Sequence, residues 1–262
     1  MPFARLILSF VLAASLLIPT ATPQTAANPA AQYLQRALAA LSANTPLTDV
    51  TLTGSAHYIA GSDDETGTAT LKAIAGASRI DLNLSSGPRS EIYNSSGGSP
   101  AGTWSGPDGV SHAISFHNLL TDPAWFFPAF PITHGLSSGY GATYVGHETR
   151  DGQAVEHLTI AQISAVQSPH GAPQITHLSR MDFFLDSTTF LPAVTTFNIH
   201  PDNNALLDIP IEVRFSDYRA VNGVQVPFHV QKFLNNGLIL DLQFQTAALN
   251  TGLATSQFQV GE

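Results

Sequence analysis

The chain has 262 residues, of which only 11% are charged, and its 19 acidic side chains outnumber the 10 basic ones. A net charge of -9 argues against nucleic-acid binding, which needs a basic stripe, and against electrostatic docking on anionic lipid. The sequence contains no cysteine, which excludes disulfides, thiolate nucleophiles and a lipidated N-terminal cysteine.

The first 26 residues have the pattern of an export signal. A single basic residue, Arg5, precedes an apolar run from Leu6 to Ile18, and Pro19 ends that run. About a dozen apolar residues are few for a helix that spans a bilayer, which needs roughly 20. We therefore predict a signal peptide over residues 1–26 and an exported, soluble, periplasmic domain over residues 27–262. An uncleaved membrane anchor is the alternative.

A helix is predicted directly after the signal. Asn28 suits the N-cap and Pro29 suits the first helical turn, and the pattern ends at Pro46. Three leucines recur at helical spacing between these points, at Leu34, Leu38 and Leu41. A helix with one narrow apolar stripe needs a surface to lie on, and the segments that follow offer a sheet.

Alternating apolar and polar residues predict about ten strands in the rest of the chain, because a period of two is the strand period. Before the C-terminal region, the segments with this pattern are 50–58, 68–75, 79–84, 89–93, 140–146, 153–162, 179–185 and 193–200. Residues 103–110 are predicted to be a short strand that turns back on itself. No internal repeat and no linker divides them, so we predict one continuous sheet.

The densest aromatic patch of the sequence lies between Ser115 and Phe130. Asp122-Pro123 is a second helix-start signal, so we predict two short helices here, the second of them ended by Pro128 and Pro131. Two interpretations remain open for this patch. It fills the core as a plug, or it forms a lid over a cavity large enough for a lipid.

The clearest pattern runs over residues 211–244. Three alternating runs are separated by Asn222-Gly223 and Asn236-Gly237, and such pairs supply the positive φ angles of tight hairpin turns. This region is therefore predicted to be an antiparallel meander with one apolar face and one polar face.

Three segments of the second half contain turn motifs that are more specific than the alternation of apolar and polar residues. They are YVGHETRDG at 144–152, DFFLDSTTFLP at 182–192 and FSDYRAVNGVQVPF at 215–228. Together they resemble the outer-membrane lipoprotein carrier superfamily (LolA/LolB-like), including its uncharacterised sorting-protein-like members. The resemblance implies a mostly β (α+β) fold, in which a single strongly curved antiparallel sheet forms a half-barrel and helices cover its concave face. The motifs mark a fold more than a function.

The same resemblance implies periplasmic binding or carriage of a lipid, a lipoprotein acyl chain or another hydrophobic ligand, with a membrane donor or acceptor protein as partner. Acyl chains are recognised by apolar area, at roughly 0.8 kcal/mol per buried methylene, so no cofactor is expected. The residues predicted to line the cavity are Leu34, Leu38, Trp125, Phe126, Phe130, Val226, Phe228, Leu240 and Leu242. The alternative is a non-catalytic protein-interaction or sensor module of the cell envelope on the same fold.

Two weaker patterns point to catalysis and to metal binding. Residues 135–139 match Gly-x-Ser-x-Gly, but no strand is predicted before them and no helix after them, as a nucleophile elbow requires. The ten histidines are scattered, without the spacing typical of zinc ligands. We therefore predict neither an enzyme nor a metal site.

Overall fold

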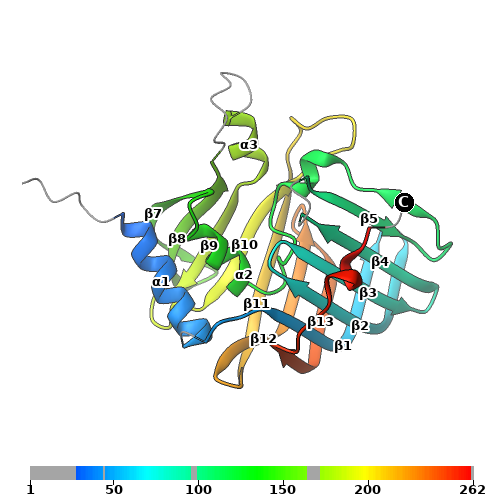
Figure 1. Ribbon diagram of the computed structural model, residues 1–262, viewed down its shortest axis with the longest axis horizontal. Helices are drawn as coiled ribbons and strands as arrows, with labels where there is room; N and C mark the ends of the chain where they lie inside the picture. The colour runs from blue at the N-terminus through cyan, green and yellow to red at the C-terminus, as the bar shows by residue number, and fades with distance from the viewer. Residues whose placement is uncertain (1–27, 44, 96–98, 164–171, 261–262) are drawn as a thin grey trace, which may run out of the picture.

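The computed structural model describes residues 28–43, 45–95, 99–163 and 172–260 (Figure 1). The predicted signal peptide lies outside these residues. The described strands form one sheet in the order β6-β5-β4-β3-β2-β1-β13-β12-β11-β10-β9-β8-β7. All the neighbouring strands are antiparallel, and β6 and β7 are the two edges, so the sheet is open.

The strands are β1 (Asp49–Ala60), β2 (Asp63–Ile74), β3 (Ala77–Leu84), β4 (Gly87–Asn94), β5 (Ala101–Ser105), β6 (Ser111–Ala113), β7 (Tyr140–Arg150), β8 (Gln153–Gln162), β9 (Met181–Asp186), β10 (Pro192–Ile199), β11 (Ile209–Val221), β12 (Val224–Leu234) and β13 (Gly237–Leu249). The helices are α1 (Pro29–Ser42), α2 (Ala129–Gly135) and α3 (Ala172–Leu178), with 3-10 turns η1 (Phe116–Leu119) and η2 (Thr255–Phe258). The sequence analysis predicted about ten strands. Edge strands as short as β6, with three residues, are too short for alternation to be recognised.

The predicted meander is β11, β12 and β13, and its first turn is confirmed. Asn222 and Gly223 both have positive φ, at 50° and 83°. The second turn differs from the prediction by one residue. Asn235 and Asn236 carry the positive φ angles, at 48° and 65°, and Gly237 is the first residue of β13. Asparagine tolerates the left-handed region well enough to serve in both turn positions.

Helix α1 is confirmed, together with its predicted cap, since the Asn28 side chain accepts a hydrogen bond from the Ala30 amide at 3.0 Å. The prediction for the aromatic patch is wrong in one respect. Pro128 and Pro131 do not end a helix, because α2 begins after Pro128 and contains Pro131 in its first turn. The first amides of a helix have no partner within it, so a proline there costs no hydrogen bond.

One hydrophobic core combines buried side chains of α1, α2 and residues 124–127 with one face of the sheet, which we call the core face. On this face Leu52, Leu71 and Ile80 are paired directly across β1, β2 and β3. Both helices belong to this core, through Leu34 and Leu41 of α1 and Phe130 and Ile132 of α2. No helix within the described ranges has the length and apolar character that crossing a membrane requires.

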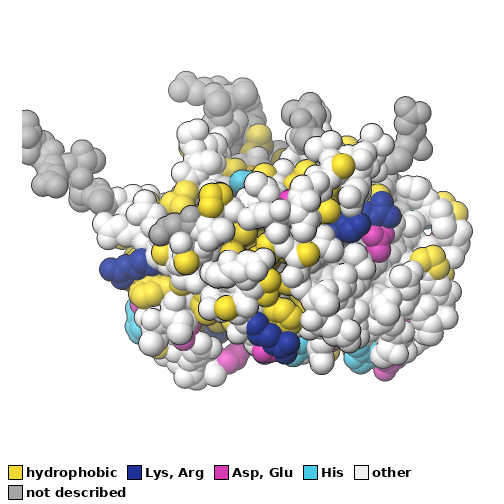
Figure 2. All heavy atoms as spheres, turned by 60° about the horizontal axis from the view of Figure 1, so that its bottom comes forward, with side chains coloured by type: hydrophobic (Ala, Val, Ile, Leu, Met, Phe, Trp, Pro, Cys, Tyr) yellow, Lys and Arg dark blue, Asp and Glu magenta, His cyan; other side chains and the backbone are white. Residues whose placement is uncertain are grey.

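The two helices lie over only one part of the sheet. The substantial contacts of α1 are with β7, β12 and α2, and those of α2 with the sheet are with β7. Figure 1 shows both helices beside β7–β10 and away from β1–β5. We call strands β7–β12 the covered half and strands β1–β6 the uncovered half, with β13 joining them. In Figure 2, hydrophobic side chains gather at the left and middle of the visible face, and charged side chains occur only in small groups.

Candidate functional site

A cleft of about 260 Å³ opens on the core face of the uncovered half. Its walls come from β1, β3, β4, β5, β12 and β13, and from Trp125 in the segment before α2. Most of the lining is apolar or aromatic, namely Tyr58, Ile80, Leu82, Trp104, Trp125, Ile239 and Leu240. Apolar lining with a few polar groups is typical of small-molecule sites.

A second cleft of about 250 Å³ adjoins the first, since Glu91, Trp104, Trp125 and Lys232 line both. It continues toward the apolar side chains of Ile114, Leu119 and Ile199. Trp104 stands on an outer strand of this half and is 47% exposed, whereas Trp125 is only 5% exposed. The combined space is therefore open at β5 and closed by packed core at Trp125.

Lys232 reaches this cleft because of its position in β12. Val226, Phe228, Val230 and Lys232 share one face of the strand, because side chains alternate. Lys232 is paired with Val213 of β11 and with Leu240 of β13, whose side chains are buried. A lysine thus occupies a position that the rest of its row fills with apolar residues.

The Lys232 ammonium is not neutralised by a direct contact. Its Nζ lies 4.3 Å from the centre of the Trp125 ring, and it makes no hydrogen bond or ion pair with any residue that the structure describes. Burial lowers the pKa of Lys232, and the negative charge of Glu91 partly offsets this effect. An ammonium over an aromatic face gains some cation–π stabilisation, but its hydrogen-bonding capacity remains unused.

Two further donors of the same cleft have no acceptor. The indole Nε1 of Trp125 and the Nε of Arg89 are both buried without a hydrogen-bond partner among the described residues. The Nη2 of the same guanidinium is paired, since it donates to Glu65 Oε1 at 2.9 Å. Hydrogen bonds from Ser86, Arg89 and Ser85 lower the pKa of Glu65 to about 2, so Glu65 stays ionised. Among the described residues, the first cleft therefore contains two buried donors without an acceptor.

The structure places the predicted cavity residues in two groups. Trp125 and Leu240 line the cleft. The other seven do not line it: Leu34, Phe126, Phe130, Val226, Phe228 and Leu242 are buried in the core, and Leu38 packs against it. Most of the aromatic patch is thus core plug, and one face of Trp125 belongs to the cleft. The sequence analysis missed Lys232, although a lysine within the apolar row of β12 was visible in the alternation.

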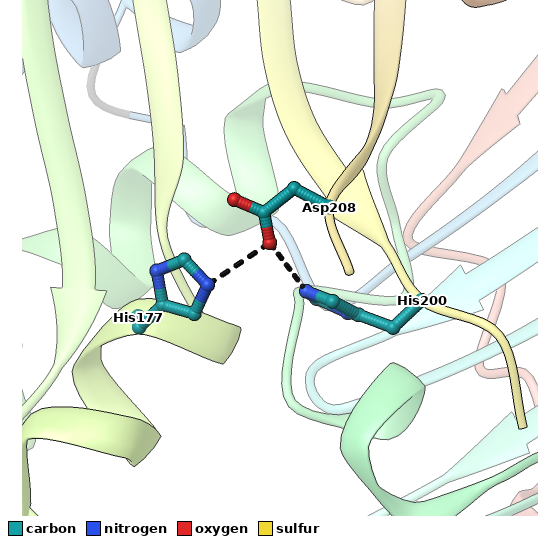
Figure 3. A group of neighbouring side chains, drawn as sticks. All are labelled: His177, His200 and Asp208. Atoms are coloured by element: carbon teal, nitrogen blue, oxygen red, sulfur yellow. Dashed lines mark hydrogen bonds and ion pairs between the residues drawn. The ribbon is translucent and has the colours of Figure 1, made fainter. Parts of the chain in front are cut away.

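A second group of side chains lies elsewhere, where α3, the end of β10 and the segment before β11 meet (Figure 3). The Nε2 atoms of His177 and His200 each lie 3.0 Å from Oδ1 of Asp208. His200 is buried, whereas His177 and Asp208 are exposed. These residues are scattered in the sequence, so spacing could not reveal them, and within the described part of the chain they form a group that could hold a metal ion.

The Gly-x-Ser-x-Gly segment does not form a nucleophile elbow. Gly135 ends α2, and the segment leads into β7 at Tyr140. The elbow needs a strand before the serine and a helix after it, and here the order is reversed. This segment therefore offers no geometry for an activated serine.

Comparisons with known proteins identify the architecture. No protein-family model and no curated protein sequence matches the chain. Among solved structures, it is similar to a putative outer membrane lipoprotein-sorting protein domain from Vibrio parahaemolyticus, with 15% identity, a TM-score of 0.54, and coverage of 88% of this chain and 96% of that one. A LolA superfamily protein from Nitrosomonas europaea matches with 12% identity, a TM-score of 0.54, and coverage of 88% and 97%.

A DUF1329 family protein from Desulfovibrio piger matches in the same way, with 11% identity, a TM-score of 0.54, and coverage of 88% and 98%. The open, curved antiparallel sheet with its helices is therefore the fold that these three structures share. The resemblance found in the turn motifs is confirmed for the fold. At these identities the likeness concerns architecture and leaves function to the site.

Proposed function

We propose that the protein binds a hydrophobic ligand of the lipid or acyl-chain class in the cleft of the uncovered half, and that it carries this ligand in the periplasm. The observation that supports the proposal best is the apolar cleft itself, because the rest of the core face is packed by α1, α2 and the aromatic patch. The clefts of about 260 and 250 Å³ lie next to each other and share four lining residues.

The energetics suit a carrier. About eight methylenes buried in this space contribute roughly 6 kcal/mol, from which the cost of ordering the ligand must be subtracted. The result is binding that is selective for apolar area and still reversible. On this proposal α1 and α2 are the helices that cover the concave face, over one half only, and the other half stays open for the ligand. A membrane donor or acceptor protein would exchange the ligand with it.

The test is a titration of the purified protein with a fluorescent fatty acid. Replacing Ile239, a partly exposed residue that lines the cleft, with tryptophan fills the space without removing core contacts. We expect Ile239→Trp to weaken binding at least about tenfold. The matched control is Val145→Trp, on exposed β7 in the covered half.

Equal binding by the wild type and by folded Ile239→Trp protein would place the ligand elsewhere. If the wild type binds no apolar probe at all, the carrier proposal fails, and the interaction module becomes the better description of the protein.

A further inference from the structure

We propose that the ligand of this cleft carries an anionic group, a carboxylate or a phosphate, which the Lys232 ammonium binds together with the Trp125 indole. This inference rests on the proposed function and adds the chemical class of the ligand. It is argued from the polar groups of the cleft, because the binding of an apolar chain alone gives them no role.

The first support is a group of unpaired donors in the first cleft. Among the described residues only four buried side-chain atoms lack a hydrogen-bond partner, and two of them, Arg89 Nε and Trp125 Nε1, belong to residues of this one cleft. Lys232 adds an unpaired ammonium at 4.3 Å from the same indole ring. A buried donor left unsatisfied destabilises the unliganded protein, so a ligand that brings acceptor oxygens recovers this free energy on binding.

The second support is the arrangement of charge. Glu91 is the carboxylate that acts on Lys232, and it lines both clefts, but it forms no ion pair with the lysine or with another described residue. In the unliganded protein, Glu91 therefore offsets the positive charge of Lys232 without direct contact. An anionic oxygen in direct contact with Lys232 compensates it better, because the interaction strengthens as the distance falls and as water leaves the cleft.

The geometry also orients the ligand. Lys232, Trp125 and Glu91 lie where the two clefts meet, while Tyr58, Ile80 and Leu82 line only the first cleft. An anionic group held at Lys232 therefore directs its chain along the apolar wall of the first cleft. A free fatty acid and an acidic phospholipid present the same anionic oxygens at this point.

The experiment compares ligands that differ only in charge. The affinities of a long-chain fatty acid and of the primary alcohol of equal length are measured by displacement of a neutral fluorescent lipid. We expect the acid to bind at least about tenfold more tightly, because a hydrogen bond to a charged group contributes about 1.5–3 kcal/mol. In Lys232→Met this preference disappears and the alcohol binds as before. Lys72→Met, the other lysine of the chain, is the matched control.

Glu91→Gln gives a signature that a merely structural role would not produce. Removing the competing carboxylate tightens binding of the acid and leaves the alcohol unchanged, so the two substitutions act in opposite directions. A parallel pair, a lysophosphatidic acid and the corresponding monoacylglycerol, tells a phosphate from a carboxylate ligand.

The outcomes separate the two proposals. If neither acid nor alcohol binds, the proposed function is wrong. If both bind with equal affinity, and Lys232→Met and Glu91→Gln change nothing, the cleft takes neutral ligands and the inference about the anionic group is overturned.

A different observation carries a second inference independently, and it concerns the group in Figure 3. We infer that His177, His200 and Asp208 form a binding site for a transition-metal ion. Their donor atoms all lie within 4.8 Å of one another. A tetrahedral ion with bonds of about 2.0–2.1 Å holds its ligands about 3.3 Å apart, so small side-chain movements from the observed 3.0 Å contacts make room for one.

The donor set indicates the kind of ion. Two imidazoles and one carboxylate suit Zn²⁺, Co²⁺, Ni²⁺ or Cu²⁺, whereas Ca²⁺ and Mg²⁺ prefer oxygen ligands. His177 and Asp208 also line a cleft of about 420 Å³, through which an ion and its remaining water ligands have access. Without an ion, the same group is held together by hydrogen bonds between the imidazoles and Asp208. The experiment distinguishes this hydrogen-bonded group from a metal site.

The test uses the full chain after treatment with EDTA. Addition of Co²⁺ should give the visible absorption of a low-symmetry complex, and Zn²⁺ should displace it. His177→Gln should weaken Co²⁺ binding at least about tenfold, because one of three protein ligands is lost. His112→Gln, an exposed histidine of β6 outside the group, should bind like the wild type. No cobalt spectrum, or unchanged affinity in His177→Gln, would overturn the inference.

Discussion

The covered and uncovered halves of the sheet share the same alternation of apolar and polar side chains, but their core faces are packed differently. In the covered half Val213, Leu158 and Phe183 are fully buried, since α1, α2 and the aromatic patch share their core. In the uncovered half Leu52 and Leu71 are also fully buried, but Ile80 and Leu82 line a cleft, and Trp104 remains 47% exposed. What differs is the position of α1 and α2, whose main contacts with the sheet are with β7 and β12, while the cleft is lined mainly by strands β1, β3, β4 and β5.

The largest expected effect is a difference in stability between a variant of the aromatic plug and a variant of the cleft. Phe126 is fully buried in the shared core, so Phe126→Ala should lower the free energy of unfolding by about 3–5 kcal/mol, through lost burial and an unfilled cavity. Trp104→Ala, at the open side of the cleft, should lower it by less than about 1 kcal/mol. Urea denaturation of both variants checks this. Equal losses would mean that the two halves are packed alike.

A smaller change in the free energy of unfolding, in the opposite direction, is expected when Lys232 is replaced. The Lys232 side chain is half-buried, and its ammonium makes no hydrogen bond or ion pair with a described residue. Replacing it with an apolar side chain of similar length removes a partial desolvation cost. Lys232→Met should therefore stabilise the unliganded protein by about 1 kcal/mol while it abolishes the preference for acidic ligands. Lys72→Met should instead destabilise slightly, because Lys72 donates a hydrogen bond to Gln257 at 2.8 Å. Thermal unfolding without ligand distinguishes the two, and a less stable Lys232→Met would contradict the account of an uncompensated charge.

The smallest effect concerns α2 and the segment before it, where His134 of α2 pairs with Asp122. The hydrogen bond that His134 Nδ1 donates to the Asp122 carboxylate raises the pKa of His134 above its ordinary value of 6.5. The protonated pair therefore stabilises the folded state fully below pH 6.5, and this contribution is lost as the pH rises through the folded-state pKa. The stability difference between wild type and His134→Gln should shrink over that rise, as measured by denaturation at several pH values.

The sequence by itself determined the strand faces, the capped first helix and the turn chemistry, because these depend on neighbours a few residues apart. Asn28 caps α1, Asn222-Gly223 makes the first tight turn, and Val226 and Leu242 are buried as the alternation predicts. The motifs at 144–152, 182–192 and 215–228 were also sufficient to identify the fold. The one-residue error at Asn235 and Asn236 arose because two asparagines can take the positive φ angles that were assigned to glycine.

Only the tertiary structure decided which apolar residues surround open space. Periodicity placed Trp125, Phe126 and Phe130 together, but the turn before α2 puts Phe126 and Phe130 in the core and leaves Trp125 at the cleft. The same limit applies to charge. Lys232 and Glu91 are 141 positions apart in the numbering, and His177, His200 and Asp208 come from three separate segments. Local patterns report which side of a strand is buried, whereas the residues that meet across a cleft depend on how distant strands pair and where the helices lie.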